Sequence, residues 1–196
     1  MHRNEANCIT ISPAACVLGA FILLVLPLNW VLSALIAAVF HEFCHYLAIK
    51  ICGGYVFRIR ISAGGIIMEF EQLSCGKECI CALAGPLGSL LLLLFIRWLP
   101  LIGLCAVVQG LFNLIPIYPM DGGRALRCCL MLLTPNQAEA ILQGVEWITI
   151  TALCTGSCYV AMRLQLGPAP LMAAIMLTFK ILSRKRPCKE RRLGVQ

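Results

Sequence analysis

Charged residues are scarce in this sequence. Together they make up 13% of its 196 residues, whereas about 25% is usual for a soluble domain. Hydrophobic residues make up 60%. A chain of this size could not bury so much apolar surface in water, because its surface is large relative to its volume. The composition therefore excludes disordered, fibrous and soluble globular proteins, and it predicts a single bundle of membrane helices.

The chain has 13 cysteines, and apart from two close groups they are spread along it. Many of these cysteines lie inside apolar runs, whereas a secreted disulfide framework would place them in loop-rich sequence. We therefore expect mainly free thiols that pack as small hydrophobic side chains. Cys75, Cys79 and Cys81 lie close together, but their C-x3-C-x-C spacing is not a standard zinc pattern.

Apolar segments recur along the whole chain, and they predict an all-α polytopic membrane protein with about six spans. The predicted spans cover residues 11–26, 29–51, 80–99, 101–117, 138–162 and 168–182. All of them belong to one domain, 1–196, which ends in a basic tail at 183–196. Between the second and third spans, Val56–Ile61 alternates apolar and basic residues, and a glycine pair and Ile66–Phe70 follow. This pattern predicts a small membrane-associated β-hairpin.

Basic residues predict the orientation of the spans. The chain has 16 lysines and arginines against 9 acidic residues, a formal net charge of +7. With six spans and both termini in the cytoplasm, every lysine and arginine except Arg97 and Arg163 lies on the cytoplasmic side. We therefore predict a multi-pass integral membrane protein with both termini cytoplasmic. The net charge is explained by this topology, and no nucleic-acid partner is expected.

Histidine is rare as well, and two of the three histidines lie in one predicted span. His41 and His45 flank Glu42 in the pattern H-E-x-x-H. On a helix, residues four apart lie on the same face, so both imidazoles can bind one metal ion. The glutamate is placed to bind a water molecule held by that metal. Ionisable residues inside a membrane span are costly, which favours a functional site over a packing role.

The third ligand has few candidates, and Asp121 is the only aspartate in the chain. It follows the predicted fourth span in the segment Asn113–Gly122, where two prolines interrupt the helix. Broken helices at membrane depth are tolerated where they line a cavity or a watery site. In the predicted topology, the two histidines and Asp121 lie at a similar depth, towards the cytoplasmic face.

The two motifs together resemble the site-2 protease family of intramembrane zinc metalloproteases. An H-E-x-x-H span is followed by N-x-x-P-x-x-P-x-D-G at the end of a later span. Ile9–Pro13, the hairpin and the six-span layout are most similar to the stage IV sporulation protein FB branch. The resemblance implies one Zn²⁺ per chain. It also implies the following residue roles: His41, His45 and Asp121 as metal ligands, Glu42 as general base, and Asn113, Pro116 and Gly122 at the substrate site.

The same resemblance carries further expectations. Ala84–Ser89 is similar to the family's third-span motif, although Ser89 stands where asparagine is usual. No regulatory CBS or PDZ domain is expected. The implied partners are the lipid bilayer, membrane regulators and a membrane-tethered or membrane-associated protein substrate, such as a pro-sigma factor in sporulation, cut near the cytoplasmic face. An edge at Val56–Ile61 or Ile66–Phe70 could hold an unwound substrate by strand addition.

Three alternatives remain open. The first is a non-enzymatic membrane metal-binding protein or divalent-cation transporter, which would leave Glu42 without a role and would be expected to show an internal repeat. The second is another H-E-x-x-H protease class whose third ligand is a glutamate in a later helix, for which Glu146 is the intramembrane candidate. The third is an inactive relative of the family.

Overall fold

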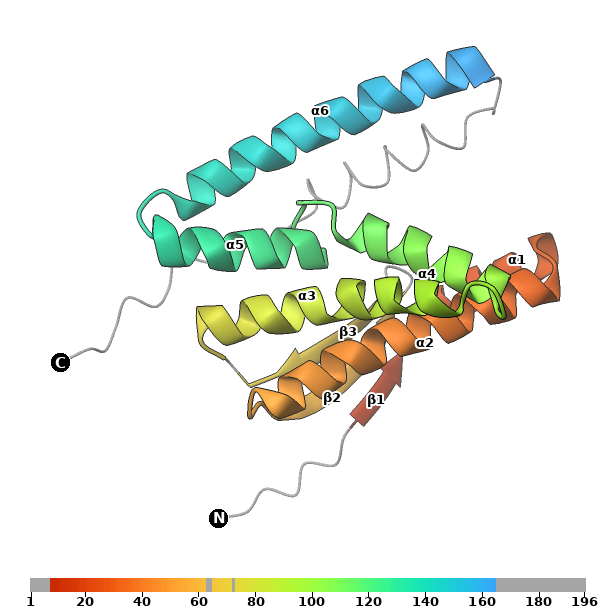
Figure 1. The fold of residues 1–196 in the computed structure, drawn as a ribbon, viewed down its shortest axis with the longest axis horizontal. Coiled ribbons are helices and arrows are strands. Elements are labelled where there is room, and N and C mark those ends of the chain that lie inside the picture. Colours follow the sequence, from red (N-terminus) through yellow and green to blue (C-terminus); the bar gives the residue numbers. More distant parts are fainter. Residues whose placement is uncertain (1–7, 63–64, 72, 165–196) are drawn as a thin grey trace. The chain divides into compact units, whose positions relative to one another are not determined.

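The computed structural model describes residues 8–62, 65–71 and 73–164 (Figure 1). The chain forms two units, Met1–Leu142 and Gln143–Gln196, which are described separately. The predicted sixth span at 168–182 and the basic tail at 183–196 lie outside the described residues.

The first unit begins with a strand and two helices. Strand β1 (Cys8–Ile11) leads into α1 (Pro13–Val25), which is followed by α2 (Leu28–Ile51). Ser12 caps α1, because its side-chain oxygen accepts a hydrogen bond of 3.2 Å from the backbone N–H of Ala15. Pro13 suits the first turn of α1, where its missing N–H has no partner to lose.

The middle of this unit contains two further apolar helices. Helix α3 (Cys75–Leu91) continues as a short 3₁₀ helix, η1 (Leu92–Phe95), and α4 (Pro100–Asn113) follows. The prediction started the third span at 80, five residues late, because the polar first turn of α3 interrupts the apolar pattern. It also extended the fourth span to 117, whereas α4 ends at Asn113, before Pro116 and Pro119 turn the chain.

Helix α5 (Asp121–Leu133) was missed, since the prediction treated this segment as a loop after the fourth span. It has no long apolar run, but its pattern is amphipathic. Asp121, Arg124 and Arg127 are spaced three apart on one side, while Ala125 and Cys128 are buried. Asp121 therefore begins a new helix rather than ending the fourth span.

The three strands form one sheet in the order β1-β2-β3. The predicted hairpin is confirmed, because β2 (Val56–Ser62) and β3 (Gly65–Phe70) pair antiparallel, with Ile61 opposite Ile66. The parallel pairing of β1 with β2 was not predicted. A parallel pair needs a crossover connection, and here α1 and α2 together provide it.

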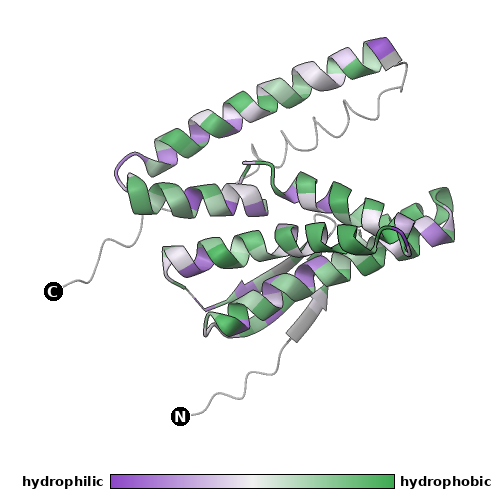
Figure 2. Cartoon of the chain, in the orientation of Figure 1, coloured by the Kyte–Doolittle hydropathy of each residue, from purple (hydrophilic) through white to green (hydrophobic). Residues whose placement is uncertain are grey.

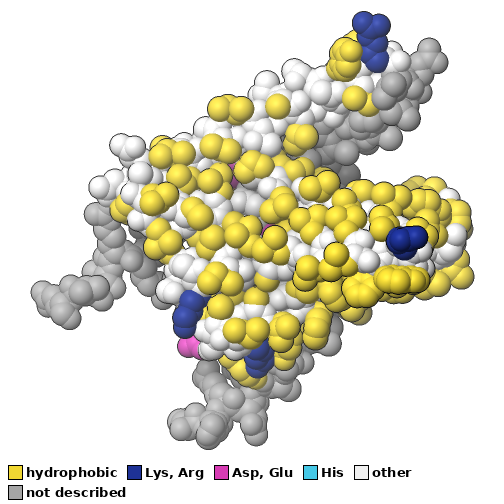
Figure 3. Space-filling model, viewed as in Figure 1, with side chains coloured by type: hydrophobic (Ala, Val, Ile, Leu, Met, Phe, Trp, Pro, Cys, Tyr) yellow, Lys and Arg dark blue, Asp and Glu magenta, His cyan; other side chains and the backbone are white. Residues whose placement is uncertain are grey.

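The outer surface of the first unit is apolar. Leu24, Leu35 and Val108 are 87%, 58% and 60% exposed, on α1, α2 and α4 respectively. Figure 2 shows that these helices are largely hydrophobic, and Figure 3 shows hydrophobic side chains gathered over the end formed by α1 and α4. Such a surface is unusual in water but suits a lipid environment.

Three described helices are long and apolar enough to cross a membrane: Leu28–Ile51, Cys75–Phe95 and Ala138–Arg163. They correspond to the predicted second, third and fifth spans. Helices α1 and α4 have 13 and 14 residues. Each is about 20 Å long, against a hydrocarbon core of about 30 Å. The structure thus supports three spans and two shorter apolar helices, and the six-span layout stays a prediction.

The second unit contains most of α6 (Ala138–Leu164), a single helix of 27 residues. Its bounds agree with the predicted fifth span, 138–162. Glu146, the alternative third ligand, is a residue of this helix.

Candidate metal centre

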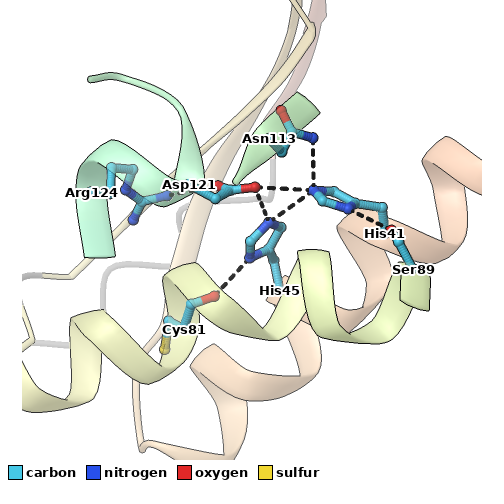
Figure 4. A network of polar contacts seen from close by, with 7 residues as sticks. All are labelled: His41, His45, Cys81, Ser89, Asn113, Asp121 and Arg124. Atoms are coloured by element: carbon cyan, nitrogen blue, oxygen red, sulfur yellow. Dashed lines mark hydrogen bonds and ion pairs between the residues drawn. The ribbon is translucent and has the colours of Figure 1, made fainter. Parts of the chain in front are cut away.

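Two elements of the first unit supply the three predicted metal ligands. His41 and His45 lie one turn apart on α2 and are buried, with exposed fractions of 1% and 8%. Asp121 is the first residue of α5. The two Nε2 atoms lie 3.2 Å apart, and each is 3.1 Å from Oδ2 of Asp121 (Figure 4). Residues that are 80 positions apart in the sequence thus share one buried centre.

Residues of helix α3 form hydrogen bonds with the Nδ1 atoms of both imidazole rings. The Nδ1–H of His45 donates a hydrogen bond of 2.7 Å to the backbone carbonyl of Cys81. Nδ1 of His41 lies 2.8 Å from the hydroxyl of Ser89, which is fully buried. With each Nδ1 engaged on α3, each Nε2 faces the centre. Hydrogen bonds of this kind orient the histidine ligands of metal sites.

The chemistry of the centre fits a metal cation. The amide N–H of Asn113 donates to Nε2 of His41 over 3.2 Å, so this nitrogen presents its lone pair. His45 carries its proton on Nδ1, and Asp121 is a carboxylate. Three electron-rich atoms therefore converge, an arrangement that a cation between them would stabilise. Their separations are close to the edge of about 3.3 Å that a tetrahedral zinc site implies.

Asp121 is ionised in this environment. Burial alone would raise the pKa of its carboxyl group, but the adjacent imidazoles of His41 and His45 outweigh that effect and lower the pKa to about 2. Its second oxygen, Oδ1, lies 4.0 Å from Nη1 of Arg124, whose Nη2 is 3.7 Å from Glu78. Arg124 therefore lies between Asp121 and Glu78, and its ion pair with Glu78 links α5 to α3.

Glu42 lies beside the centre without being one of the three convergent ligands. It is half-buried on α2, and its carboxylate interacts electrostatically with His45, His41 and Asp121. It is thus near the centre. Its role as general base stays a prediction.

Small residues let α3 approach α2 closely, which explains the composition of Ala84–Ser89. A Cβ atom on Gly85 would lie 2.6 Å from Cδ2 of His45. A Cβ atom on Gly88 would lie 2.8 Å from Cβ of Cys44. Real Cβ atoms do not approach other atoms so closely, so glycine is required at both positions.

Replacing Gly85 with alanine should displace His45 and weaken zinc binding by at least about tenfold, the size of effect seen when ligand-orienting contacts are lost. Gly76→Ala on the same helix is the matched control, because a Cβ atom at Gly76 would meet nothing within 4 Å. Zinc titration of both purified variants tests this expectation. Equal zinc affinity in the two variants would contradict it.

The three predicted substrate-site residues lie in or beside the turn between α4 and α5. Asn113 is the last residue of α4, and Pro116 is half-buried in the turn. Gly122 is buried in the first turn of α5, where a Cβ atom would lie 2.8 Å from the carbonyl oxygen of Ile115. The structure therefore gives Gly122 a packing role, and substrate contact by any of the three stays a prediction.

Other contributors to the centre were not predicted from the sequence. Ser89 was singled out in the third-span motif because it stands where asparagine is usual, but its contact with His41 was not predicted. The Cys81 carbonyl gives no sequence signal, because any residue would supply it. Within the described residues, His41, His45 and Asp121 are the one group arranged to bind a metal. Cys75, Cys79 and Cys81 do not form such a group, and within the first unit Asp121 lies beside the histidines.

Comparisons with known proteins agree with this chemistry. The model of the Peptidase M50B-like family matches residues 14–120, which include both histidines and Asn113. A Synechocystis sp. protein provisionally named a zinc metalloprotease is 32% identical over 149 residues, which cover 62% of this chain. The match spans 39% of that relative's own length.

A solved structure has a similar fold. It is the site-2 protease from Methanocaldococcus jannaschii, which aligns with a TM-score of 0.60 over 100% of this chain and 98% of that one. The two sequences are 18% identical, so the likeness concerns the fold alone.

Proposed function

Because the chain belongs to the Peptidase M50B-like family, we propose that it is an intramembrane zinc metalloprotease of the site-2 type. The observation that carries the proposal is the convergence of His41 Nε2, His45 Nε2 and Asp121 Oδ2 inside a bundle of apolar helices. Such a cluster of ionisable groups is costly in a membrane unless it has a function. A single zinc ion per chain fits one such centre.

The residues around the centre have different roles in the proposed hydrolysis. Zinc at this position would lower the pKa of a water molecule towards about 7 and polarise the scissile carbonyl. Glu42 accepts the proton of the attacking water and passes it to the leaving amine. Asn113 offers an amide at the edge of the centre, where it can bind the backbone of an extended substrate. Pro116 and Gly122 shape the turn beside it.

Metal removal tests this assignment. The protein is purified in detergent, its zinc content is measured, and cleavage of a membrane-tethered candidate substrate is followed before and after treatment with a chelator. We expect one zinc per chain, loss of cleavage with the metal, and recovery when zinc is restored. Cleavage that persists after complete metal removal would contradict a metalloprotease.

The substrate is proposed from the resemblance to the stage IV sporulation protein FB branch. We place cleavage near the cytoplasmic face of a membrane-tethered or membrane-associated regulatory protein, such as a pro-sigma factor. The bias of lysine and arginine supports a multi-pass topology with both termini cytoplasmic. The lipid bilayer and membrane regulators are the further partners we propose, and nucleic acid has no part in this function.

Strand addition to the sheet is the proposed way of holding an unwound substrate, and the structure narrows the choice of edge. Strand β2 pairs with β1 on one side and with β3 on the other, so the predicted edge at Val56–Ile61 is not free. Among the strands that the structure describes, β3 has a neighbour on one side only. Its last residue, Phe70, lies 5.6 Å beneath the guanidinium of Arg124, which also contacts Asp121. The free edge of β3 therefore leads towards the metal centre.

Met68 is the position at which this edge can be tested. The N–H of Glu71 donates a hydrogen bond to the carbonyl oxygen of Tyr55, on the β2 side. Successive residues of a strand direct their N–H groups to opposite sides, so the N–H of Met68, three residues earlier, points away from β2. Met68→Pro removes this outward donor and spares the pairing with β2. We expect cleavage efficiency to fall about tenfold, with zinc retained, since strand addition depends on such backbone hydrogen bonds.

Met68→Leu is the matched control, because it keeps the N–H and a similar side-chain volume. Measurement of kcat/KM and zinc content for both variants tests whether the substrate adds to the edge of β3. Unchanged cleavage by Met68→Pro would rule out strand addition at β3.

A further inference from the structure

A pair of thiols lies outside the metal centre and has no part in the proposed hydrolysis. Sγ of Cys79 on α3 is 3.6 Å from Sγ of Cys129 on α5. The thiol of Cys79 also donates to the carbonyl oxygen of Ala125 over 3.8 Å, which directs it towards α5. The two residues are 50 positions apart in the sequence, so packing of α3 against α5 brings them together.

Water reaches this part of the fold. Cys79 follows Lys77 and Glu78 in the charged first turn of α3, and Lys77 is exposed. Cys129 is exposed and lies two residues after Arg127, on a helix that is not a candidate membrane span. The pair therefore lies where small polar oxidants and reductants have access.

Neighbouring cysteines differ from this pair. Cys128 is buried, and loss of solvation is the main effect that raises the pKa of its thiol to about 12. It therefore stays protonated and unreactive, because the thiolate is the nucleophilic form. Cys81 is buried as well. Among the cysteines within 8–62, 65–71 and 73–164, Cys79 and Cys129 form the one hydrogen-bonded sulfur pair that includes an exposed thiol.

We propose that Cys79 and Cys129 are a redox modification site, at which a hydroperoxide forms a reversible disulfide that links α3 to α5. The exposed Cys129 thiolate attacks the peroxide, forms a sulfenic acid and releases water or an alcohol. The Cys79 thiol then attacks the Cys129 sulfur, and the hydroxyl group of the sulfenic acid leaves as water. Two thiols thus give up two electrons to one hydroperoxide, and a dithiol reductant reverses the reaction.

The geometry suits this reaction. A disulfide requires a sulfur separation of about 2.05 Å, so the two sulfurs, now 3.6 Å apart, must close by roughly 1.5 Å. The helices themselves are already joined here by the ion pair of Glu78 and Arg124. Because α5 begins at Asp121, the link would restrain the helix that carries this residue against α3.

Oxidation of the intact protein in detergent tests the proposal. After treatment with hydrogen peroxide, alkylation and digestion, mass spectrometry should show a Cys79–Cys129 cross-linked peptide that disappears on reduction. Amide hydrogen exchange in residues 121–133 should slow on oxidation. Cys129→Ser should lose both effects, and Cys105→Ser on α4, outside the pair, should keep both.

The results that overturn the proposal are equally specific. One is oxidation that leaves Cys79 and Cys129 unlinked, or that links other cysteines as often. A second is irreversible oxidation of Cys129 to a sulfinic acid without a disulfide. A third is unchanged exchange in α5 of the linked protein, which would remove the restraint. Cys79→Ser provides an independent variant if Cys129→Ser folds poorly, and neither readout depends on proteolysis.

Discussion

Glu42→Gln is expected to abolish peptide hydrolysis and to leave zinc binding unchanged. Glutamine has nearly the same shape as glutamate but cannot accept the proton of an attacking water. Positioned general acid–base groups contribute about 10² to 10⁴ in rate, so kcat should fall by at least a hundredfold. Zinc should remain, because the three convergent ligand atoms belong to His41, His45 and Asp121.

The comparison with Glu71→Gln makes this result specific, because Glu71 is an exposed carboxylate at the end of β3. That variant should cleave at the wild-type rate. Full activity of Glu42→Gln would contradict the assignment of the base, and loss of zinc would make Glu42 a ligand. Unaltered zinc transport into vesicles by Glu42→Gln, without cleavage by the wild type, would favour the transporter alternative.

Asp121→Asn should lose zinc. The asparagine side chain has a similar shape, but it is neutral and a much weaker ligand for zinc. Changes to groups that only orient a ligand reduce metal affinity 10- to 100-fold, so loss of a ligand should reduce it by at least about 100-fold. Measurement of bound zinc by competition with a chromophoric chelator gives the affinity directly.

Glu146→Gln is the informative control for this variant. In a protease class that uses a glutamate as third ligand, Glu146→Gln would lose zinc and Asp121→Asn would keep it. The geometry predicts the reverse, since Asp121 Oδ2 lies 3.1 Å from both imidazole nitrogens. Zinc retained at full affinity by Asp121→Asn would therefore overturn the proposed ligand set.

The grouping of His41, His45 and Asp121 could be predicted from the sequence because ionisable residues are few in so apolar a chain. His41 and His45 are two of three histidines, and Asp121 is the only aspartate, so few other combinations were available. Long apolar helices were equally visible, as α2 and α6 show, because a membrane requires an uninterrupted run of about 20 residues.

The sequence did not predict elements and contacts that depend on other parts of the fold. Strand β1 is four residues long and exists by pairing with β2, which follows two helices later. Helix α5 has no apolar run, and its buried glycines fit only against the turn formed by residues 114–118. Ser89 contacts His41 only because Gly85 and Gly88 let α3 approach α2. For β1 and Ser89 the deciding contact is with residues far away in the sequence, and for α5 it is with the turn that precedes the helix.

The parallel pairing of β1 with β2 constrains how the chain is threaded through the bilayer. Strand β1 precedes α1, and β2 follows α2, yet the two strands share one sheet. A sheet cannot be divided by a membrane, so the path from residue 11 to residue 56 must cross it an even number of times. Either α1 and α2 both cross, or neither does. The strand before α1 and the hairpin after α2 therefore face the same compartment, a parity that holds independently of where the lysines and arginines lie.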